Sequence, residues 1–235
     1  MKRSVSVVIP AYNEGEELKT TIADVDMIVK RSFDDYELLI FDDCSTDKTG
    51  ELADKLAKKN PRVRVFHNKE NMNMGYNFRM GIKNAAKNYV VLLSGPDSVS
   101  LNSIETFMGK VGETCVLSSY IANQETRPRH RRIISFLVTN TLNLLFGLKL
   151  GYYFGMQAYE TKIAKKLKTT TNSFALLAEA LIRSIKKGYP HKEIPYYVRK
   201  TKGTSTTAFR MRNVAGIIAL ALRLFFDVNF GKGRK

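Results

Sequence analysis

The stretch SVSVVIPAYNE, residues 4–14, and the stretch ELLIFDDCSTDKT, residues 37–49, decide the fold of this 235-residue chain. Runs of β-branched and aliphatic residues, at 4–10 and 36–41, are typical of buried strands. Between them, apolar side chains recur at the spacing of one helical face over residues 16–30. A strand, a helix and a second strand in this order predict a βαβ unit with parallel strands.

The same alternation continues along the chain. The sequence predicts strands at 62–66, 89–93 and 115–118 and helices at 47–59, 75–87 and 101–111. In the second half we expect an uncharged helical segment at 133–148, a helix at 172–187, an edge strand at 193–199 and an amphipathic helix at 214–226. The expected fold class is therefore α/β, with a mostly parallel central sheet flanked by helices.

Composition narrows the class of protein. Hydrophobic residues make up 44% and charged residues 26% of the chain, a balance typical of globular proteins. No run approaches the ~18 consecutive apolar residues of a membrane-spanning helix, and the N-terminus lacks the apolar core of a signal peptide. We therefore expect neither an integral membrane protein nor a secreted one. Cys44 and Cys115 lie far apart and the histidines are scattered, so we expect no structural zinc and a cytoplasmic location.

The chain is strongly basic, with 38 Lys and Arg residues against 22 Asp and Glu residues and a formal net charge of +16. Such a surplus implies an anionic partner: nucleic acid, an acidic membrane surface or a phosphorylated small molecule. No helix-turn-helix, zinc or stacking-aromatic pattern accompanies the charge. We therefore expect no nucleic-acid partner.

Polar residues follow each of the first four predicted strands, where ligands bind in parallel α/β sheets. Three of these four loops carry carboxylates, at Glu14, at the pair Asp42 and Asp43, and at Asp97. The alternative is that these acids only form turns and cap helices. An α/β domain without a ligand would need no acid at these positions, so the pattern favours a binding site.

The segments VVIPAYNE, residues 7–14, and FDDCSTDKT, residues 41–49, resemble the opening of family-2 glycosyltransferases. Residues 68–81 and 188–205 are similar to two further segments of that family. The nearest subgroup is the polyprenyl-phosphate sugar transferases, such as dolichyl-phosphate mannose synthase. The resemblance implies a GT-A domain at 1–205, with a nucleotide-binding half at about 1–118 and an acceptor half at about 119–205. A basic amphipathic helix and tail would follow at 206–235.

The resemblance also implies a reaction. A sugar would pass with inversion from a nucleoside-diphosphate sugar to a membrane-associated acceptor, with polyprenyl phosphate as the first candidate and a saccharide or glycolipid hydroxyl as the second. Family members hold Mg²⁺ or Mn²⁺ with an Asp-x-Asp motif after the fourth strand, where this chain has Gly95-Pro96-Asp97. Asp97 is therefore the expected metal ligand. The expected nucleotide-binding residues are Pro10, Ala11, Tyr12, Glu14, Asp42 and Asp43.

Basic residues gain a role in this context. In the polyprenyl-phosphate subgroup, arginines before the interfacial helices contact phosphates, which implies the same for Arg127, Arg131 and Arg132. Lys200 and Lys202 are candidates for a second phosphate contact. A phosphate acceptor is already anionic and needs no general base, whereas a hydroxyl acceptor needs one. The expected catalytic residues are Asp97, Arg132 and, as that base, Glu179.

Three alternatives remain open at this point. The basic run at 127–132 is equally compatible with a solvated loop. The apolar segments at 133–148 and 214–226 either pack in the core or lie in the headgroup layer of a membrane, where the neighbouring arginines would meet anionic lipid. A chain with one acid in place of two could also be a catalytically silent relative, a module that binds a membrane or a partner protein.

Overall fold

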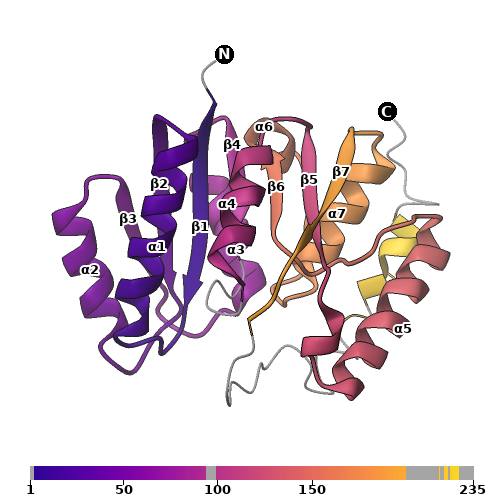
Figure 1. Cartoon of the computed structure of the whole chain (residues 1–235), viewed down its shortest axis with the longest axis horizontal. Coiled ribbons are helices and arrows are strands. Elements are labelled where there is room, and N and C mark those ends of the chain that lie inside the picture. The colour runs from indigo at the N-terminus through magenta and orange to yellow at the C-terminus, as the bar shows by residue number, and fades with distance from the viewer. Residues whose placement is uncertain (1–2, 94–98, 200–216, 218–219, 222, 228–235) are drawn as a thin grey trace.

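The computed structural model describes residues 3–93, 99–199, 217, 220, 221 and 223–227. One seven-stranded sheet, in the order β3-β2-β1-β4-β6-β5-β7, runs through the middle of the molecule with helices on both sides (Figure 1). The strands are β1 Ser4–Ala11, β2 Asp35–Asp42, β3 Val63–His67, β4 Tyr89–Leu92, β5 Val116–Ile121, β6 Gln157–Glu160 and β7 His191–Tyr196. β7 forms one edge, as the sequence predicts.

The pairings of β1 with β2 and β4, of β2 with β3 and of β5 with β7 are parallel. Parallel neighbours need helical crossovers, and these bury the aliphatic faces of the sheet. Val7, Val8, Leu38, Leu39 and Val91 are all fully buried. The α/β class and the mostly parallel sheet are therefore confirmed.

The helices agree with the predicted order, except that the short α6, Thr161–Ala164, has no predicted counterpart. They are α1 Glu17–Ser32, α2 Thr49–Lys59, α3 Met74–Asn84, α4 Leu101–Lys110, α5 Arg129–Phe146, α6 Thr161–Ala164 and α7 Leu176–Lys186, with a 3₁₀ turn, η2, at Gln124–Thr126. In α1 the apolar stripe that predicts the helix is the face that is buried, through Leu18, Ile22, Val25 and Val29. The described residues of the predicted C-terminal helix, among them 223–227, are also helical.

β6 is the one strand that the sequence does not predict. It is antiparallel to both neighbours, β4 and β5, and lies in the interior of the sheet. Its first residue, Gln157, is 1% exposed and donates to the carbonyl oxygens of Tyr153 and Leu177, and its own amide oxygen accepts from Tyr159 Oη at 2.6 Å. Partners distant in the sequence therefore satisfy a polar residue that looks unsuitable for an interior strand.

α5 begins at Arg129, so four of the six residues of the basic run at 127–132 form the first turn of a helix rather than a loop. Figure 1 shows α5 at the edge of the molecule with the short C-terminal helix beside it. The rings of Phe146 and Phe225 join these two helices with centroids 6.4 Å apart. Within the described residues, no helix is long and apolar enough to cross a membrane.

Candidate functional site

The loops after β1 and β2 are bound to each other at the carboxyl edge of the sheet. The amide of Asp43 donates to the carbonyl oxygen of Ala11, and the amide of Asn13 donates to Ser45 Oγ. The side chain of Asn13 in turn accepts from the amide of Thr46 at 2.9 Å. Ser45 and Thr46 therefore connect the two loops and do not cap α2, which begins at Thr49 without a side-chain cap.

Thr49 completes this connection. Its hydroxyl accepts from the amides of Glu14 and Gly15, both at 2.9 Å, and its side chain is fully buried. The first turn of α2 therefore holds the backbone of the β1 loop. Among the residues predicted to bind a nucleotide, Ala11 is buried and Tyr12 is 48% exposed at the same edge.

Asp43 organises the third loop, between β3 and α3. Its carboxylate accepts from the side-chain amide of Asn68 and the backbone amide of Met72, both at 2.8 Å, and from the amide of Asn73 at 2.9 Å. The residue is 4% exposed. A carboxylate has about four lone-pair sites, so three bonds leave one site for a ring N–H of a base. The structure thus brings the predicted acids Asp42 and Asp43 together with Asn68 at one edge.

Asp42 has a partner that the sequence analysis missed. His67, the last residue of β3, places Nδ1 2.9 Å from Asp42 Oδ2 and Nε2 3.1 Å from Asp54 Oδ1. Asp42 Oδ1 also accepts from the amide of Ser45. Asp54 lies on α2, thirteen residues before the histidine, so no local pattern signals the contact. His67 therefore connects β3 and α2 to the acid that shapes the β2 loop.

The contacts of His67 predict that the stability of the folded protein depends on pH. The hydrogen bond to Asp42 raises its pKa above the ordinary value, partial burial opposes this, and Asp54 adds to the rise. Because the pKa of His67 is higher in the folded than in the unfolded protein, its contacts contribute their full stabilisation when the pH is below the unfolded-state pKa of about 6.5. This stabilisation is lost as the pH rises through the folded-state pKa. Because the ring is half exposed, we expect less than about 1 kcal/mol.

The measurement is the melting temperature of the wild type and of His67→Gln from pH 5.5 to 9. The wild type should exceed the variant most at the acidic end, and the difference should shrink as the pH rises. His191→Gln is the matched control, because burial lowers the pKa of His191 and its pH dependence has the opposite sign. A difference for His67→Gln that is constant with pH would contradict the prediction.

The described residues do not form a metal site by themselves. No group of three or more His, Cys, Asp or Glu side chains that could hold a metal gathers in the part of the chain that the structure describes. Asp42 and Asp43 are engaged by His67 and by loop amides. The predicted ligand Asp97 lies in residues 94–98, outside the described residues, as do Lys200 and Lys202. The described side chains alone therefore do not fit a metal.

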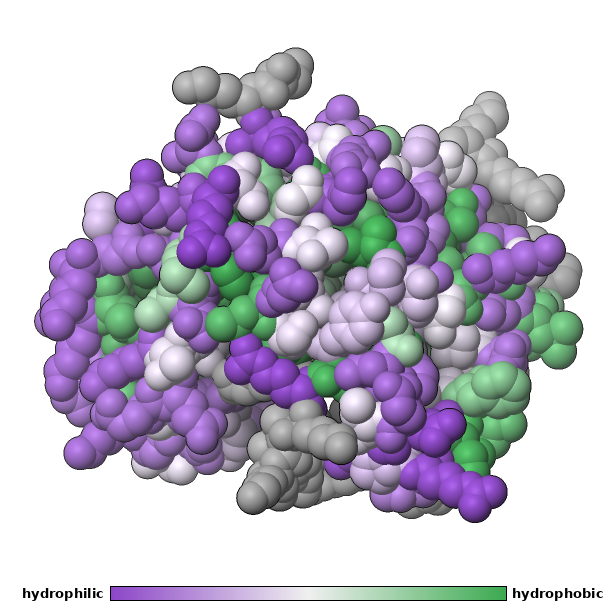
Figure 2. Space-filling view, viewed as in Figure 1, coloured by the Kyte–Doolittle hydropathy of each residue, from purple (hydrophilic) through white to green (hydrophobic). Residues whose placement is uncertain are grey.

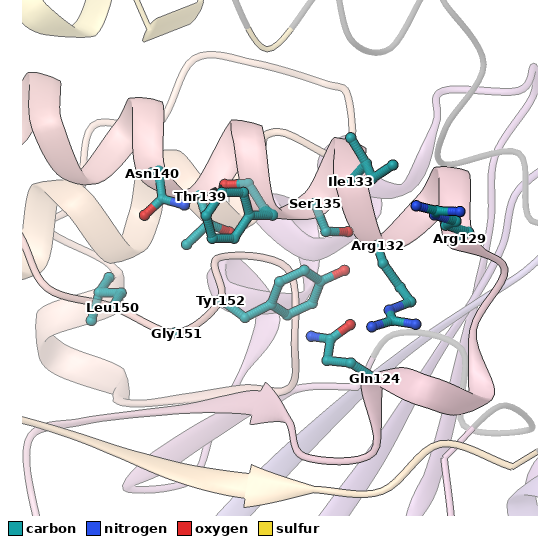
Figure 3. A pocket seen from close by; sticks show the side chains of 11 residues that line it. Gln124, Arg129, Arg132, Ile133, Ser135, Thr139, Asn140, Leu150, Gly151 and Tyr152 are labelled. Carbon is teal, nitrogen blue, oxygen red and sulfur yellow. Dashed lines mark hydrogen bonds between the residues drawn. The ribbon is translucent and has the colours of Figure 1, made fainter.

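A cavity of about 610 Å³ lies along α5. Figure 3 shows Arg129 and Arg132 beside Gln124 at one end of it, and Leu150 and Asn140 at the other. Tyr152 lies between these ends, and Ile133 and Phe136 add apolar lining. The cavity therefore combines a cationic end with an apolar wall, the lining that an amphiphilic anion requires.

The arginines of the basic run have different surroundings. Arg129 and Arg132 line the cavity, and neither side chain forms an ion pair with any described residue. Arg131 lies on the same turn of α5 but does not line the cavity. The Arg127 guanidinium donates to Gln124 Oε1 at 3.2 Å and Ser135 Oγ at 3.3 Å, and it lies over the Tyr152 ring. Arg127 therefore supports the cavity from behind, and Arg129, which the sequence analysis passed over, lines it.

The prediction that Glu179 is a general base is corrected by its surroundings. The side chain is 0% exposed, and its carboxylate pairs with Arg183 Nε at 3.0 Å. It also accepts from the amides of Thr170 and Thr171 at 3.0 and 3.2 Å. A carboxylate enclosed in this way does not reach an acceptor hydroxyl, so Glu179 has a structural role. The helical pattern predicts its position on α7 but not the face on which it lies.

The fold matches solved glycosyltransferases. A glucosyl-3-phosphoglycerate synthase from Mycobacterium tuberculosis, solved with Mn²⁺, uridine diphosphate and phosphoglyceric acid, has a TM-score of 0.69 at 14% identity. The match covers 99% of this chain and 80% of that one. Another structure of the same enzyme, with Mg²⁺ and uridine diphosphate, has a TM-score of 0.67. These likenesses confirm the expected GT-A fold.

Curated relatives are glycosyltransferases. Glycosyltransferase GlyG of Streptococcus pneumoniae is 34% identical to this chain, and the match covers 48% of this chain and 36% of GlyG. A cholesterol galactosyltransferase of Borreliella burgdorferi is 32% identical, and that match covers 46% of this chain and 29% of the relative. Glycosyltransferase AglD of Haloferax volcanii is 25% identical over 95% of this chain and 37% of its own. The chain thus spans about a third of the length of these relatives. The family model described as "Glycosyl transferase family 2" matches residues 6–168, more than half of the chain, and the protein belongs to that glycosyltransferase family.

Proposed function

We propose that the protein transfers a sugar from a nucleoside-diphosphate sugar to a polyprenyl phosphate at a membrane surface, with inversion. The family and the GT-A fold support a nucleotide-sugar donor. The observation that carries the choice of acceptor is the cavity along α5, where two arginines that form no ion pair with a described residue stand at one end of an apolar wall. A phosphate headgroup fits the arginine end, and an isoprenoid chain fits the wall formed by Ile133, Phe136 and Leu150.

The chemistry follows from an acceptor that is already anionic. An oxygen of the acceptor phosphate attacks the anomeric carbon, the bond from that carbon to the diphosphate breaks, and the nucleoside diphosphate leaves. The loops held by Thr49 and Asp43 would position the nucleotide, and Arg129 and Arg132 would orient the attacking phosphate. When Mg²⁺ or Mn²⁺ is bound, it neutralises charge on the leaving diphosphate, and Asp97 is the residue that we propose to hold it.

A lipid hydroxyl is the second candidate acceptor. The relative from Borreliella burgdorferi is named for cholesterol, an apolar alcohol, and an apolar wall such as that of the cavity would accept a lipid alcohol. A hydroxyl needs a general base. The buried position of Glu179 removes the base that the sequence suggested, and this favours the phosphate acceptor.

The acceptor proposal predicts the effect of Arg132→Ala. A charge-assisted hydrogen bond contributes about 1.5–3 kcal/mol, so the loss of the guanidinium should raise the KM for a polyprenyl phosphate about tenfold or more. The KM for the nucleotide-sugar should change little. The measurement is initial-rate kinetics in detergent micelles with a short-chain polyprenyl phosphate and with the matching polyprenol.

Arg131→Ala is the matched control, because it removes the same charge from the same turn of α5 without altering the lining of the cavity. An equal KM increase in both variants would show a general charge effect and contradict the assigned contact. Faster transfer to the polyprenol than to its phosphate would instead support the hydroxyl acceptor.

A further inference from the structure

α5 is a helix whose polar side faces inward. Ser135 and Thr139 are 6% and 7% exposed, and Ser135 accepts from Arg127. One turn on, the Asn143 side chain bonds both the amide and the carbonyl oxygen of Leu150 and accepts from Tyr153 Oη at 2.9 Å. These bonds fix the rotation of the helix, because turning it would leave the inward polar groups without partners.

The outward side of α5 is apolar. Ile133, Phe136, Leu137 and Leu144 are 51%, 68%, 58% and 84% exposed. At 3.6 residues per turn these four side chains fall within an arc of about 100°, opposite the buried side. They are half of the large hydrophobic residues that are exposed in the described part of the chain. Single exposed apolar residues are ordinary, but a cluster of them on one helical face, here interrupted by the exposed Asn140, marks an interaction surface.

The helix beside α5 adds a further exposed apolar residue, and exposed arginines lie on both helices. Phe226, 60% exposed, lies on the helix that packs against α5 through Phe225 and Phe146. Arg129 and Arg132 are exposed on the first turns of α5, and Arg223 is exposed on the neighbouring helix. Figure 2 shows apolar surface along the side of the molecule where α5 lies, with strongly hydrophilic surface at its lower end.

We propose that this outward face, consisting of Ile133, Phe136, Leu137, Leu144 and Phe226, docks on an anionic phospholipid bilayer. An apolar cluster with exposed arginines on the same helices fits the boundary between acyl chains and acidic headgroups, and a net charge of +16 directs the whole chain toward such a surface. A water-soluble partner protein would need a matched apolar groove and acids, whereas a bilayer supplies both kinds of contact without a specific shape. The axis of α5 would lie along the membrane plane.

Docking in this orientation also explains how the cavity is reached. Ile133 and Phe136 belong both to the outward face and to the lining of the cavity. An amphiphile in the bilayer could therefore enter between them without crossing water. This link to the acceptor rests on the proposed function, whereas the docking itself requires no transferase activity.

The absence of tryptophan from the sequence makes a direct test possible. Leu144→Trp places a single fluorophore at the most exposed position of the face and away from the cavity lining. With vesicles of phosphatidylcholine and phosphatidylglycerol, its emission should shift to the blue and saturate with lipid. Met27→Trp, on α1 and 43% exposed, is the matched control and should not shift.

Further variants measure the two contributions. Leu137→Glu with Leu144→Glu should weaken vesicle binding at least tenfold in co-sedimentation, because each leucine loses its burial in lipid. Arg223→Ala should weaken it about fivefold, the equivalent of about 1 kcal/mol per basic residue, and the effect should diminish at high salt. Thermal melting of each variant confirms that the fold is intact.

Several results would overturn the proposal. These are the absence of a blue shift in Leu144→Trp with anionic vesicles, and an equal shift in Met27→Trp. A blue shift that grows with protein concentration in the absence of lipid, together with a doubled mass, would assign the face to a second copy of the chain. Transfer to a short-chain acceptor in detergent separates this test from the proposed function, because Leu137→Glu with Leu144→Glu should retain that activity.

Discussion

The variant Asp97→Asn should lose about 10³-fold or more in turnover while keeping its melting temperature. Charge stabilisation by a bound divalent cation contributes several kcal/mol in the transition state, and about 4 kcal/mol corresponds to three powers of ten in rate. The resemblance to family-2 glycosyltransferases places one acid, Asp97, where that family has two, so we expect the proposed metal to depend on this one carboxylate. The measurement is sugar transfer at saturating nucleotide-sugar with Mn²⁺ and with Mg²⁺.

Two controls define the interpretation. Glu16→Gln removes the same negative charge from an exposed surface pair with Lys19 and should leave the turnover unchanged. In a thermal-shift assay, a nucleoside diphosphate at about a hundred times its dissociation constant should stabilise the wild type by about 2.7 kcal/mol, and a chelator should abolish this in a metal-dependent site. Near-normal turnover of Asp97→Asn would remove the metal assignment. No stabilisation of the wild type by any nucleotide would favour a catalytically silent relative that acts as a binding module.

The variant Glu179→Ala should lower the free energy of unfolding by about 3 kcal/mol, because it leaves the largely buried Arg183 guanidinium with the more exposed Asp227 carboxylate as its remaining partner among the described residues. It also removes the acceptor for the amides of Thr170 and Thr171. This segment supports α3: the carbonyl oxygen of Asn172 accepts from the amide of Tyr76, and a Cβ on Gly75 would lie 2.2 Å from the carbonyl oxygen of Ser173. The measurement is chemical denaturation of both proteins.

A second variant of this residue separates its structural role from a catalytic one. Glu179→Gln retains the shape and one acceptor oxygen, so it should lose less stability than Glu179→Ala, and its activity should follow its folded fraction. If Glu179 were a general base, Glu179→Gln would instead lose most of its turnover with a hydroxyl acceptor and keep the melting temperature of the wild type. That second pattern would restore the catalytic role for Glu179.

The sequence predicts that Asp42 and Asp43 lie beside the β1 loop at the carboxyl edge of the sheet, because the information there is local. A strand ends where its aliphatic run ends, so Asp42 is the last residue of β2, Asp43 follows it directly, and both meet the end of β1 across a parallel pairing. It does not predict the contacts of His67, because the partner Asp54 becomes a neighbour only when α2 packs beside β3. It also misses β6, in which buried Gln157 depends on partners from other segments.

The sequence by itself determined the α/β class, the order of the elements, the resemblance to family-2 glycosyltransferases and the basic, apolar character of α5. Only the tertiary structure decided which way side chains face. Helical periodicity shows that Ser135 and Leu144 lie on different sides of α5, but not which side is buried, because that depends on hydrogen-bond partners such as Leu150 and Tyr153. The same limit applies to Glu179, whose burial follows from Arg183 and the 170–171 backbone, groups that come together only in the folded chain.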